Sequence, residues 1–399
     1  MKKILLIIPS GGVGGIERLA LNFYNFYKGK GYYVKVLKII KDEIDIVNFG
    51  EDELFLSDID FSEMTKKGRL FFYLKSPLLL RKIILKHKFT DSISFGDLPN
   101  IFSSLTFTKE NKVASLHALK SVEISNDSFL STISKISYRT SYYFLDKVVC
   151  ISEAIRKDLI EKCNFKFHNK LEVIYNPHNV EELVKLSNET LDDSFEKSLF
   201  EKKTILFIGR LTIQKSPWHL LKSFSLLENQ NQINLVFIGD GMPKVKEYLD
   251  ELIKLYHLEN NVFFLGRKSN PYKYLAKSTL LALTSFYEGT PNVIVESIAT
   301  NTPVVTSNCT DGIMELMQLN HYKEHEELIE TDAGIITPNF FKGKLEIIKE
   351  NNYIGEEHIF AAALNLVLND LSYKERLLQN KTQLLEKYDV EKVAIKYLC

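Results

Sequence analysis

Short apolar runs alternate with helix-like segments along the whole chain, and this alternation constrains the fold most strongly. Such runs lie at residues 3–8, 204–208, 235–238 and 304–307, and each leads into a loop and then a helix-like segment. Continuous apolar strands separated by helices are typical of parallel sheets that are covered on both faces. We therefore predict an α/β protein with two doubly wound, Rossmann-like parallel sheets that face a cleft.

Length and composition restrict the class of protein further. With 399 residues, 45% of them apolar, the chain is expected to form two domains of ordinary size with sizeable cores. Lysine and arginine balance aspartate and glutamate to a net charge of zero. The overall charge therefore gives no reason to expect nucleic acid as a partner.

The cysteines and the apolar runs indicate where the chain resides. No C-x-x-C pair occurs, so we expect neither a disulfide framework nor a zinc site, and a reducing cytoplasm fits. The apolar run at residues 4–8 is too short for a signal peptide, and no stretch approaches the roughly 20 apolar residues of a membrane span. The cysteines are Cys150, Cys163, Cys309 and Cys399.

The stretch at residues 285–306 combines a turn, a short helix and two carboxylates. Glu288 lies in the turn, Thr290 is expected to cap the helix, and Pro291 is expected to open it. Backbone N–H groups and the positive end of the helix dipole then follow Glu288, and the side chain of Glu296 leans back toward the same end. This pattern predicts an anion seat flanked by two carboxylates, as a sugar nucleotide requires. The seat comprises Gly289, Thr290, Pro291 and Asn292.

The same two glutamates also fit a surface helix with solvated charges, which is the more common case for a lone pair at this spacing. Their context favours the anion seat. E-G-T-P-N-V-I-V-E at residues 288–296 resembles the E-x7-E signature of retaining glycosyltransferases with the GT-B fold, and the whole stretch resembles the glycosyltransferase 4 family. We assign Glu288 to hydroxyls of the transferred sugar and Glu296 to hydroxyls of the ribose.

Two features of the first half support this resemblance. G-G-V-G-G-I-E-R at residues 11–18 resembles the family's G-G-x-E-R loop, which implies that Gly14 and Gly15 face the donor phosphates and the acceptor. A tight turn that needs glycine explains the loop equally well, and its spacing does not match a dinucleotide fingerprint. S-L-H-A places His117 just beyond a predicted strand, and it resembles the family's histidine beside the transferred sugar.

Two cationic positions in the second half complete the predicted donor site. G-R-L-T-I-Q-K-S at residues 209–216 resembles the family's G-R-L-x-x-x-K-G, with Ser216 in place of the usual glycine. Arg210 can hold a phosphate through two donors, and Lys215 adds a point charge. By the same resemblance, Arg267 lies near the nucleobase.

The resemblance also divides the chain into domains. V-I-Y-N-P at residues 173–177 resembles the segment that closes the family's first domain. We therefore predict an acceptor-side domain at 1–178, a nucleotide-sugar-binding domain at 179–372, and a C-terminal helix at 373–399 that crosses back to the first domain.

The expected activity is transfer of a hexosyl or N-acetylhexosaminyl group from a nucleotide sugar, such as a UDP-sugar, with retention of the anomeric configuration. His117 and Glu288 are the expected catalytic residues, and the acceptor is expected to be a lipid-linked or cell-envelope glycan. We expect no cofactor and no metal, because the D-x-D at residues 58–60 fits a solvated acidic turn. The alternatives are a sugar-nucleotide epimerase or hydrolase on the same fold, and an inactive membrane-associated scaffold.

A basic segment at residues 64–90 carries eight Lys or Arg residues among aromatic and aliphatic side chains. Such a segment suits the surface of an anionic membrane, although an ordinary amphipathic helix with solvated charges fits as well. We therefore expect a cytoplasmic protein that is peripheral on the inner face of the cell membrane. A helix is expected to begin at Ser76 and Pro77.

Overall fold

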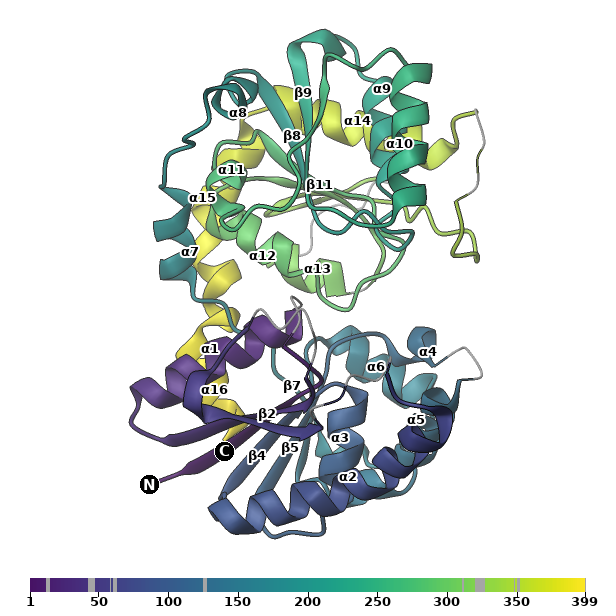
Figure 1. Cartoon of the computed structure of the whole chain (residues 1–399). Coiled ribbons are helices and arrows are strands. Elements are labelled where there is room, and N and C mark those ends of the chain that lie inside the picture. Colours follow the sequence, from purple (N-terminus) through teal and green to yellow (C-terminus); the bar gives the residue numbers. More distant parts are fainter. Residues whose placement is uncertain are drawn as a thin grey trace. The chain divides into compact units, whose positions relative to one another are not determined.

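The computed structural model describes residues 1–11, 15–41, 47–57, 59, 63–124, 128–310, 312–319, 327–347, 349 and 352–398 (Figure 1). The chain divides into two units. The first comprises Met1–His178 and Lys387–Cys399, and the second comprises Asn179–Glu386.

The first unit is built on a seven-stranded parallel sheet with the order β3-β2-β1-β4-β5-β6-β7. The order reverses between β1 and β4, as in a doubly wound fold. The strands are β1 (Lys3–Ile8), β2 (Tyr33–Ile40), β3 (Glu53–Ser57), β4 (Asp91–Phe95), β5 (Asn111–Leu116), β6 (Lys147–Cys150) and β7 (Leu171–Val173). The helices are α1 (Gly15–Gly29), α2 (Lys66–His87), α3 (Asp97–Ser104), α4 (Lys120–Glu123), α5 (Phe129–Ser137), α6 (Glu153–Glu161) and α16 (Val390–Tyr397).

Alternate residues of β1 supply two cores, one on each face of this sheet, because successive strand side chains point to opposite faces. Ile4, Leu6 and Ile8 pack with residues of α1 and α16, which lie side by side in Figure 1. Leu5 and Ile7 pack on the other face with residues of α2 and α3. Both faces are therefore covered, which explains the continuous apolar strands.

The second unit repeats the design with the strand order β10-β9-β8-β11-β12-β14-β13. Its strands are parallel except that β13 pairs antiparallel with β14 at the edge. The strands are β8 (Lys203–Ile208), β9 (Ile233–Ile238), β10 (Val262–Phe264), β11 (Leu280–Leu283), β12 (Val304–Ser307), β13 (Ile329–Thr331) and β14 (Gly334–Thr337). The helices are α7 (Val180–Ser187), α8 (Ser194–Leu199), α9 (Pro217–Ser225), α10 (Pro243–Leu255), α11 (Tyr272–Leu275), α12 (Asn292–Ala299), α13 (Gly312–Met317), α14 (Gly355–Asn369) and α15 (Ser372–Leu385). The two predicted doubly wound sheets are confirmed.

The helix expected to begin at Ser76 and Pro77 is a wrong prediction, since both residues lie inside α2. The helix begins earlier, where Thr65 accepts a hydrogen bond from the Gly68 amide at 3.1 Å. Proline removes one helical hydrogen bond, the one to the Tyr73 carbonyl. The helix nevertheless continues to His87, and the Ser76 hydroxyl donates to the Phe72 carbonyl at 2.8 Å.

The return of the chain to the first unit begins later than residue 373. The predicted helix is divided into α15, a 3₁₀ turn at Glu386–Tyr388, and α16, which begins after the Asp389 side chain accepts from the Lys392 amide at 2.8 Å. Because α15 packs against α12, it belongs to the second unit, and the first unit resumes at Lys387.

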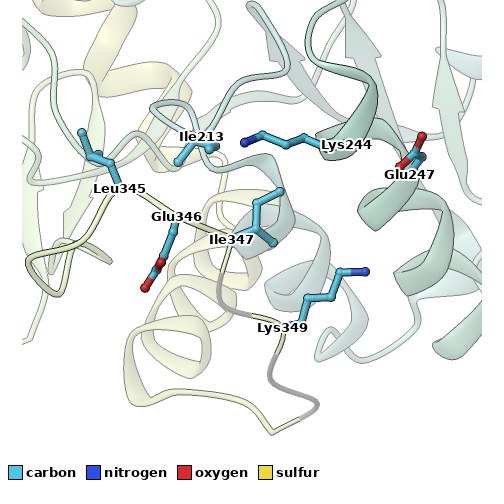
Figure 2. A pocket seen from close by; sticks show the side chains of 7 residues that line it. All are labelled: Ile213, Lys244, Glu247, Leu345, Glu346, Ile347 and Lys349. Atoms are coloured by element: carbon cyan, nitrogen blue, oxygen red, sulfur yellow. The ribbon is translucent and has the colours of Figure 1, made fainter.

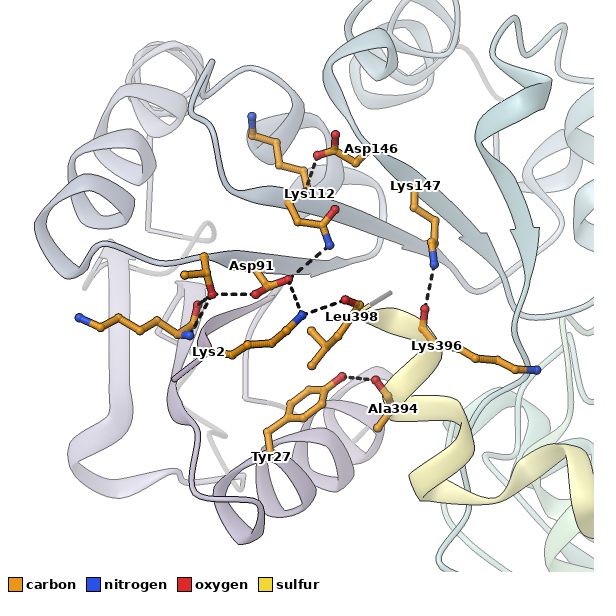
Figure 3. A network of polar contacts seen from close by, with 12 residues as sticks. Lys2, Tyr27, Asp91, Lys112, Asp146, Lys147, Ala394, Lys396 and Leu398 are labelled. Carbon is orange, nitrogen blue, oxygen red and sulfur yellow. Dashed lines mark hydrogen bonds and ion pairs between the residues drawn. The ribbon is translucent and has the colours of Figure 1, made fainter.

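Polar contacts fasten α16 to the first unit (Figure 3). Tyr27 donates to the Ala394 carbonyl at 2.8 Å, and Lys2 donates to the Leu398 carbonyl at 2.9 Å. Lys147 donates to the Lys396 carbonyl at 2.8 Å. The carbonyls at the end of this helix have no intrahelical partner, so these donors satisfy them and fix the helix in place.

Candidate active site

The switch point of the second sheet lies between β8 and β11, and it is the place where open α/β sheets bind ligands. The loop after β8 carries Arg210 and Lys215 and leads into α9. The loop after β11 carries Glu288 and leads into α12. Two of the predicted motifs therefore meet at the carboxyl ends of two neighbouring strands in the middle of the sheet.

Backbone and side-chain hydrogen bonds hold these two loops together. The Phe286 amide donates to the Gln214 carbonyl at 2.8 Å, and the Gln214 side chain donates to the Tyr287 carbonyl at 3.0 Å. Thr284 donates to the Ser216 carbonyl at 3.0 Å. The relative position of the two loops is thus fixed by the protein itself.

Within this frame Lys215 and Glu288 form an ion pair. Their side chains are only 17% and 11% exposed, so the pair is largely buried. Ser285 donates to the same Glu288 oxygen at 2.9 Å, which fixes the carboxylate from a second direction. Burial, and then the charge of Glu288, raises the pKa of the Cys309 thiol.

The sequence patterns missed the roles of Ser285 and Gln214. Ser285 lies only three residues before Glu288, but no pattern indicated the bond. Gln214 reaches the Tyr287 carbonyl only once the two loops are folded together.

The helix after Glu288 begins one residue later than predicted. Pro291, with an extended ψ of 100°, is the N-cap of α12, so Thr290 does not cap the helix. The side chain of Pro291 makes no capping bond, and the positive end of the helix dipole lies beside Gly289 and Asn292. Glu296 lies on the second turn and is buried at 6% exposure, so the surface-helix alternative for the two glutamates is wrong.

Ser216 takes the backbone conformation that glycine normally provides. Its φ of 36° and ψ of 54° are left-handed, and its hydroxyl donates to the Thr284 carbonyl. This bond reaches a residue 68 positions away and holds Ser216 in a conformation that residues other than glycine seldom adopt. Ser216 thus takes the left-handed backbone that a glycine could take without strain.

The two predicted arginines lie outside the ion pair. Arg210 is exposed in the loop after β8, and within the described residues no ion pair with it is found. Arg267 follows β10 and donates to Asp240 at 2.7 Å, where both side chains are largely exposed. Gly239 lies between these loops, where a Cβ atom would come 2.1 Å from the Gly209 carbonyl oxygen, so glycine is required.

The remaining predicted residues belong to the first unit. His117 follows β5, and its Nε2 atom is buried with no hydrogen-bond partner among the described residues. Burial, and then the charge of Lys120, lowers the pKa of His117 to about 3. Gly15 begins α1, whereas Gly14, Asp58 and Asp60 lie outside the described residues.

A pocket of about 350 Å³ lies elsewhere in the second unit (Figure 2). It is formed by the loop after β8, helix α10 and the segment before α14, and it includes none of the predicted site residues. Its lining consists of Ile213, Lys244, Glu247, Leu345, Glu346, Ile347 and Lys349. Across the described part of the chain, no group of three or more His, Cys, Asp or Glu residues is arranged to hold a metal ion.

Comparison with known proteins agrees with this fold. Residues 190–331 match the family model described as Glycosyl transferases group 1. The chain is 25% identical, over 100% of its length and 98% of the other, to the GalNAc-alpha-(1->4)-GalNAc-alpha-(1->3)-diNAcBac-PP-undecaprenol alpha-1,4-N-acetyl-D-galactosaminyltransferase of Campylobacter jejuni. It is 29% identical to an uncharacterized glycosyltransferase of Methanocaldococcus jannaschii, but there the match spans 64% of this chain and 65% of the relative.

Solved structures extend the comparison to the fold. The crystal structure of Anabaena HepE in complex with UDP-glucose superposes with a TM-score of 0.71 at 18% identity, covering 100% of this chain and 98% of that one. The two doubly wound units have the GT-B fold of these structural neighbours. Residues 190–331 are similar to the group 1 glycosyl transferases, and the Campylobacter relative that covers the whole chain is itself named as a glycosyltransferase.

Proposed function

We propose that the protein transfers a hexosyl or N-acetylhexosaminyl group from a UDP-sugar to a lipid-linked or cell-envelope glycan, with retention of configuration. The observation that carries the proposal is the Lys215–Glu288 ion pair beside the start of α12, at the switch point of the second sheet. The name of the Campylobacter relative supports a lipid-linked acceptor, and the UDP-glucose complex of HepE supports the donor.

The proposed donor site divides the ligand between cationic and anionic groups. Arg210, Lys215 and the start of α12 would receive the diphosphate, because hydrogen-bond donors and positive charge stabilise the leaving group as it gathers charge. Glu296 would accept hydrogen bonds from the ribose. Since these groups already supply positive charge, we propose transfer without a metal ion.

The held carboxylate of Glu288 favours sugar positioning over covalent catalysis. Lys215 and Ser285 both engage it, so it is oriented to accept hydrogen bonds from sugar hydroxyls. We propose that the acceptor oxygen attacks the anomeric carbon on the face from which the diphosphate departs. The carbon–oxygen bond to the diphosphate breaks, a phosphate oxygen takes the acceptor proton, and the nucleoside diphosphate leaves.

The membrane-facing part of the proposal rests on α2. Phe71, Leu74 and Leu78 are 65%, 70% and 61% exposed at helical spacing, although the opposite face of α2 is buried in the core. Lys67, Lys75 and Lys82 recur on the exposed side. In the described part of the chain, no helix is long and apolar enough to span a bilayer. We propose peripheral binding to the inner face of an anionic membrane.

Vesicle sedimentation tests this membrane contact. Binding to anionic vesicles should exceed binding to neutral ones and weaken with salt, because the cations act through screened charge. The variant Leu74→Ser/Leu78→Ser should bind less. The control Leu366→Ser changes a leucine of α14 that is 42% exposed, and it should bind like the wild type. Equal binding of all three proteins, or none by the wild type, would refute the membrane proposal.

Transfer itself is tested with UDP-sugars and a polyprenyl-diphosphate-linked glycan. The proposal expects a lengthened glycan only when both are present, with the same anomeric configuration as the donor. Turnover of the donor alone would favour the epimerase or hydrolase alternative. Donor binding without turnover in any combination would favour the inactive scaffold.

A further inference from the structure

A buried lysine lies three residues beyond His117. Lys120 is 3% exposed, and its ammonium lies 3.0 Å from Asp97 and 2.5 Å from Glu123. Asp97 follows β4, whereas Lys120 begins the helix that follows β5. One ammonium thus ties together the loops at the carboxyl ends of two neighbouring strands, at the edge where His117 lies.

Asp97, one partner of the Lys120 ion pairs, is itself held in place by further hydrogen bonds. Tyr138, at the end of α5, donates to the other Asp97 oxygen at 3.3 Å. Gly96, with a φ of 91°, donates its amide to the Ser115 carbonyl at 3.1 Å, which links the β4 loop to β5 directly. Burial alone would lower the pKa of Lys120, but Asp97 and Glu123 raise it, so the lysine stays charged.

Stability alone does not explain such a cluster. Removing the Lys120 ammonium from water is costly, and its partners stay partly in solvent, with 29% of the Asp97 side chain and 43% of the Glu123 side chain exposed. Buried charges of this kind can instead fix one particular geometry. Among the predicted site residues, His117 lies nearest to this cluster along the chain, since only two residues separate it from Lys120, and its Nε2 atom lacks a partner among the described residues.

We propose that Lys120 is a positioning residue for sugar transfer. Held between Asp97 and Glu123, it fixes the loop that carries His117 and keeps the Nε2 atom available to a hydroxyl of the transferred sugar. This role rests on the proposed function of His117, and it adds a residue that acts through His117 without touching the substrate.

Steady-state kinetics of Lys120→Met and Lys120→Arg form the first test. Lys120→Met should lower kcat by about 10- to 100-fold, the range expected for a mispositioned catalytic group, while the KM for the UDP-sugar changes little. Lys120→Arg should restore most of kcat, because it keeps the charge. The matched control is Lys112→Met, since Lys112 is also 3% exposed but lies at the amino end of β5, where it donates to the Thr108 carbonyl.

A double-mutant cycle separates positioning from general stability. In a His117→Ala background, Lys120→Met should cause no further loss of kcat, because the group through which it acts is gone. Full additivity, or an equal loss of kcat in Lys112→Met, would overturn the proposal. If Lys120→Met does not fold, Asp97→Asn replaces it in the double-mutant cycle with His117→Ala. This variant removes the ion pair of Lys120 with Asp97 and keeps the one with Glu123.

An NMR measurement tests the positioning without any turnover. The ring resonances of His117, assigned with His117→Ala, should shift in Lys120→Met and stay near their wild-type position in Lys120→Arg. Unmoved resonances in Lys120→Met would overturn the role of Lys120. A wild-type protein that transfers no sugar, but whose His117 signal responds to Lys120→Met, would refute the proposed function and leave the positioning intact.

Discussion

Lys215 and Glu288 form an ion pair that joins the loops after β8 and β11, and Ser285 donates to the same carboxylate. The lysine expected to meet the donor phosphates and the glutamate expected to meet the sugar are therefore one unit. In the proposed donor complex, the pair would mark the boundary between the phosphate side and the sugar side of the donor.

This pairing separates the two glutamates experimentally. Glu288→Gln should leave UDP binding unchanged or make it slightly tighter, because UDP has no sugar to hold and Lys215 is freed from a competing charge. Its turnover should fall by about 100-fold, since the sugar is no longer held in register. Calorimetry with UDP beside initial rates measures both quantities.

Glu296→Gln is the matched comparison, because both side chains are about nine-tenths buried on the same stretch. It should weaken UDP binding by about 10- to 100-fold. A hydrogen bond to a charged group contributes roughly 1.5–3 kcal/mol, and its loss corresponds to a change in affinity of this size. An equal loss of UDP affinity in the two variants would contradict the assignment of ribose to one and transferred sugar to the other.

Ser216 offers a test of the phosphate loop that does not depend on activity. Ser216→Ala should lower the free energy of unfolding by about 1 kcal/mol, because it keeps the left-handed backbone and loses the hydrogen bond to Thr284. Ser216→Gly should be closer to the wild type, because relief of the backbone offsets the lost bond. Urea denaturation of the three proteins gives the order, and an alanine variant more stable than the glycine variant would contradict it.

The lowered pKa of His117 predicts that the stability of the fold depends on pH. Its pKa is lowered to about 3 in the folded chain, against about 6.5 in the unfolded one. Between these values the unfolded chain binds a proton that the folded chain does not, so the free energy of unfolding falls as the pH falls from about 6.5 toward 3. His117→Gln should flatten this decline between pH 7 and pH 5. The exposed His358→Gln is the control, and identical slopes in all three proteins would exclude the effect.

The elements most predictable from sequence were those set by local pattern. Apolar runs such as residues 204–208 predicted the strands of both sheets, since burial on both faces requires continuous apolar residues. The helices at the end of the chain were harder to predict. Asp389 interrupts the predicted helix through a side-chain cap, and only the packing of α15 on α12 assigns that helix to the second unit.

The candidate site was predictable only residue by residue. The motifs named Lys215 and Glu288 separately, but no spacing along the chain indicates that they pair, because the loops meet only after β8 and β11 become neighbours. Lys120 belongs to none of the recognised motifs. Its significance comes from Asp97, which lies on a different strand end and becomes its partner through the sheet.

The proposed function requires the loop after β8 to bind the diphosphate of the donor, and titration calorimetry with UDP measures this binding. Wild-type protein should bind UDP, and Arg210→Ala and Lys215→Ala should each weaken it by about tenfold or more, because each leaves phosphate charge unmatched. Lys244→Ala, an exposed lysine of α10 in the same unit, should bind UDP like the wild type. Undiminished binding in both Arg210→Ala and Lys215→Ala would contradict the claim.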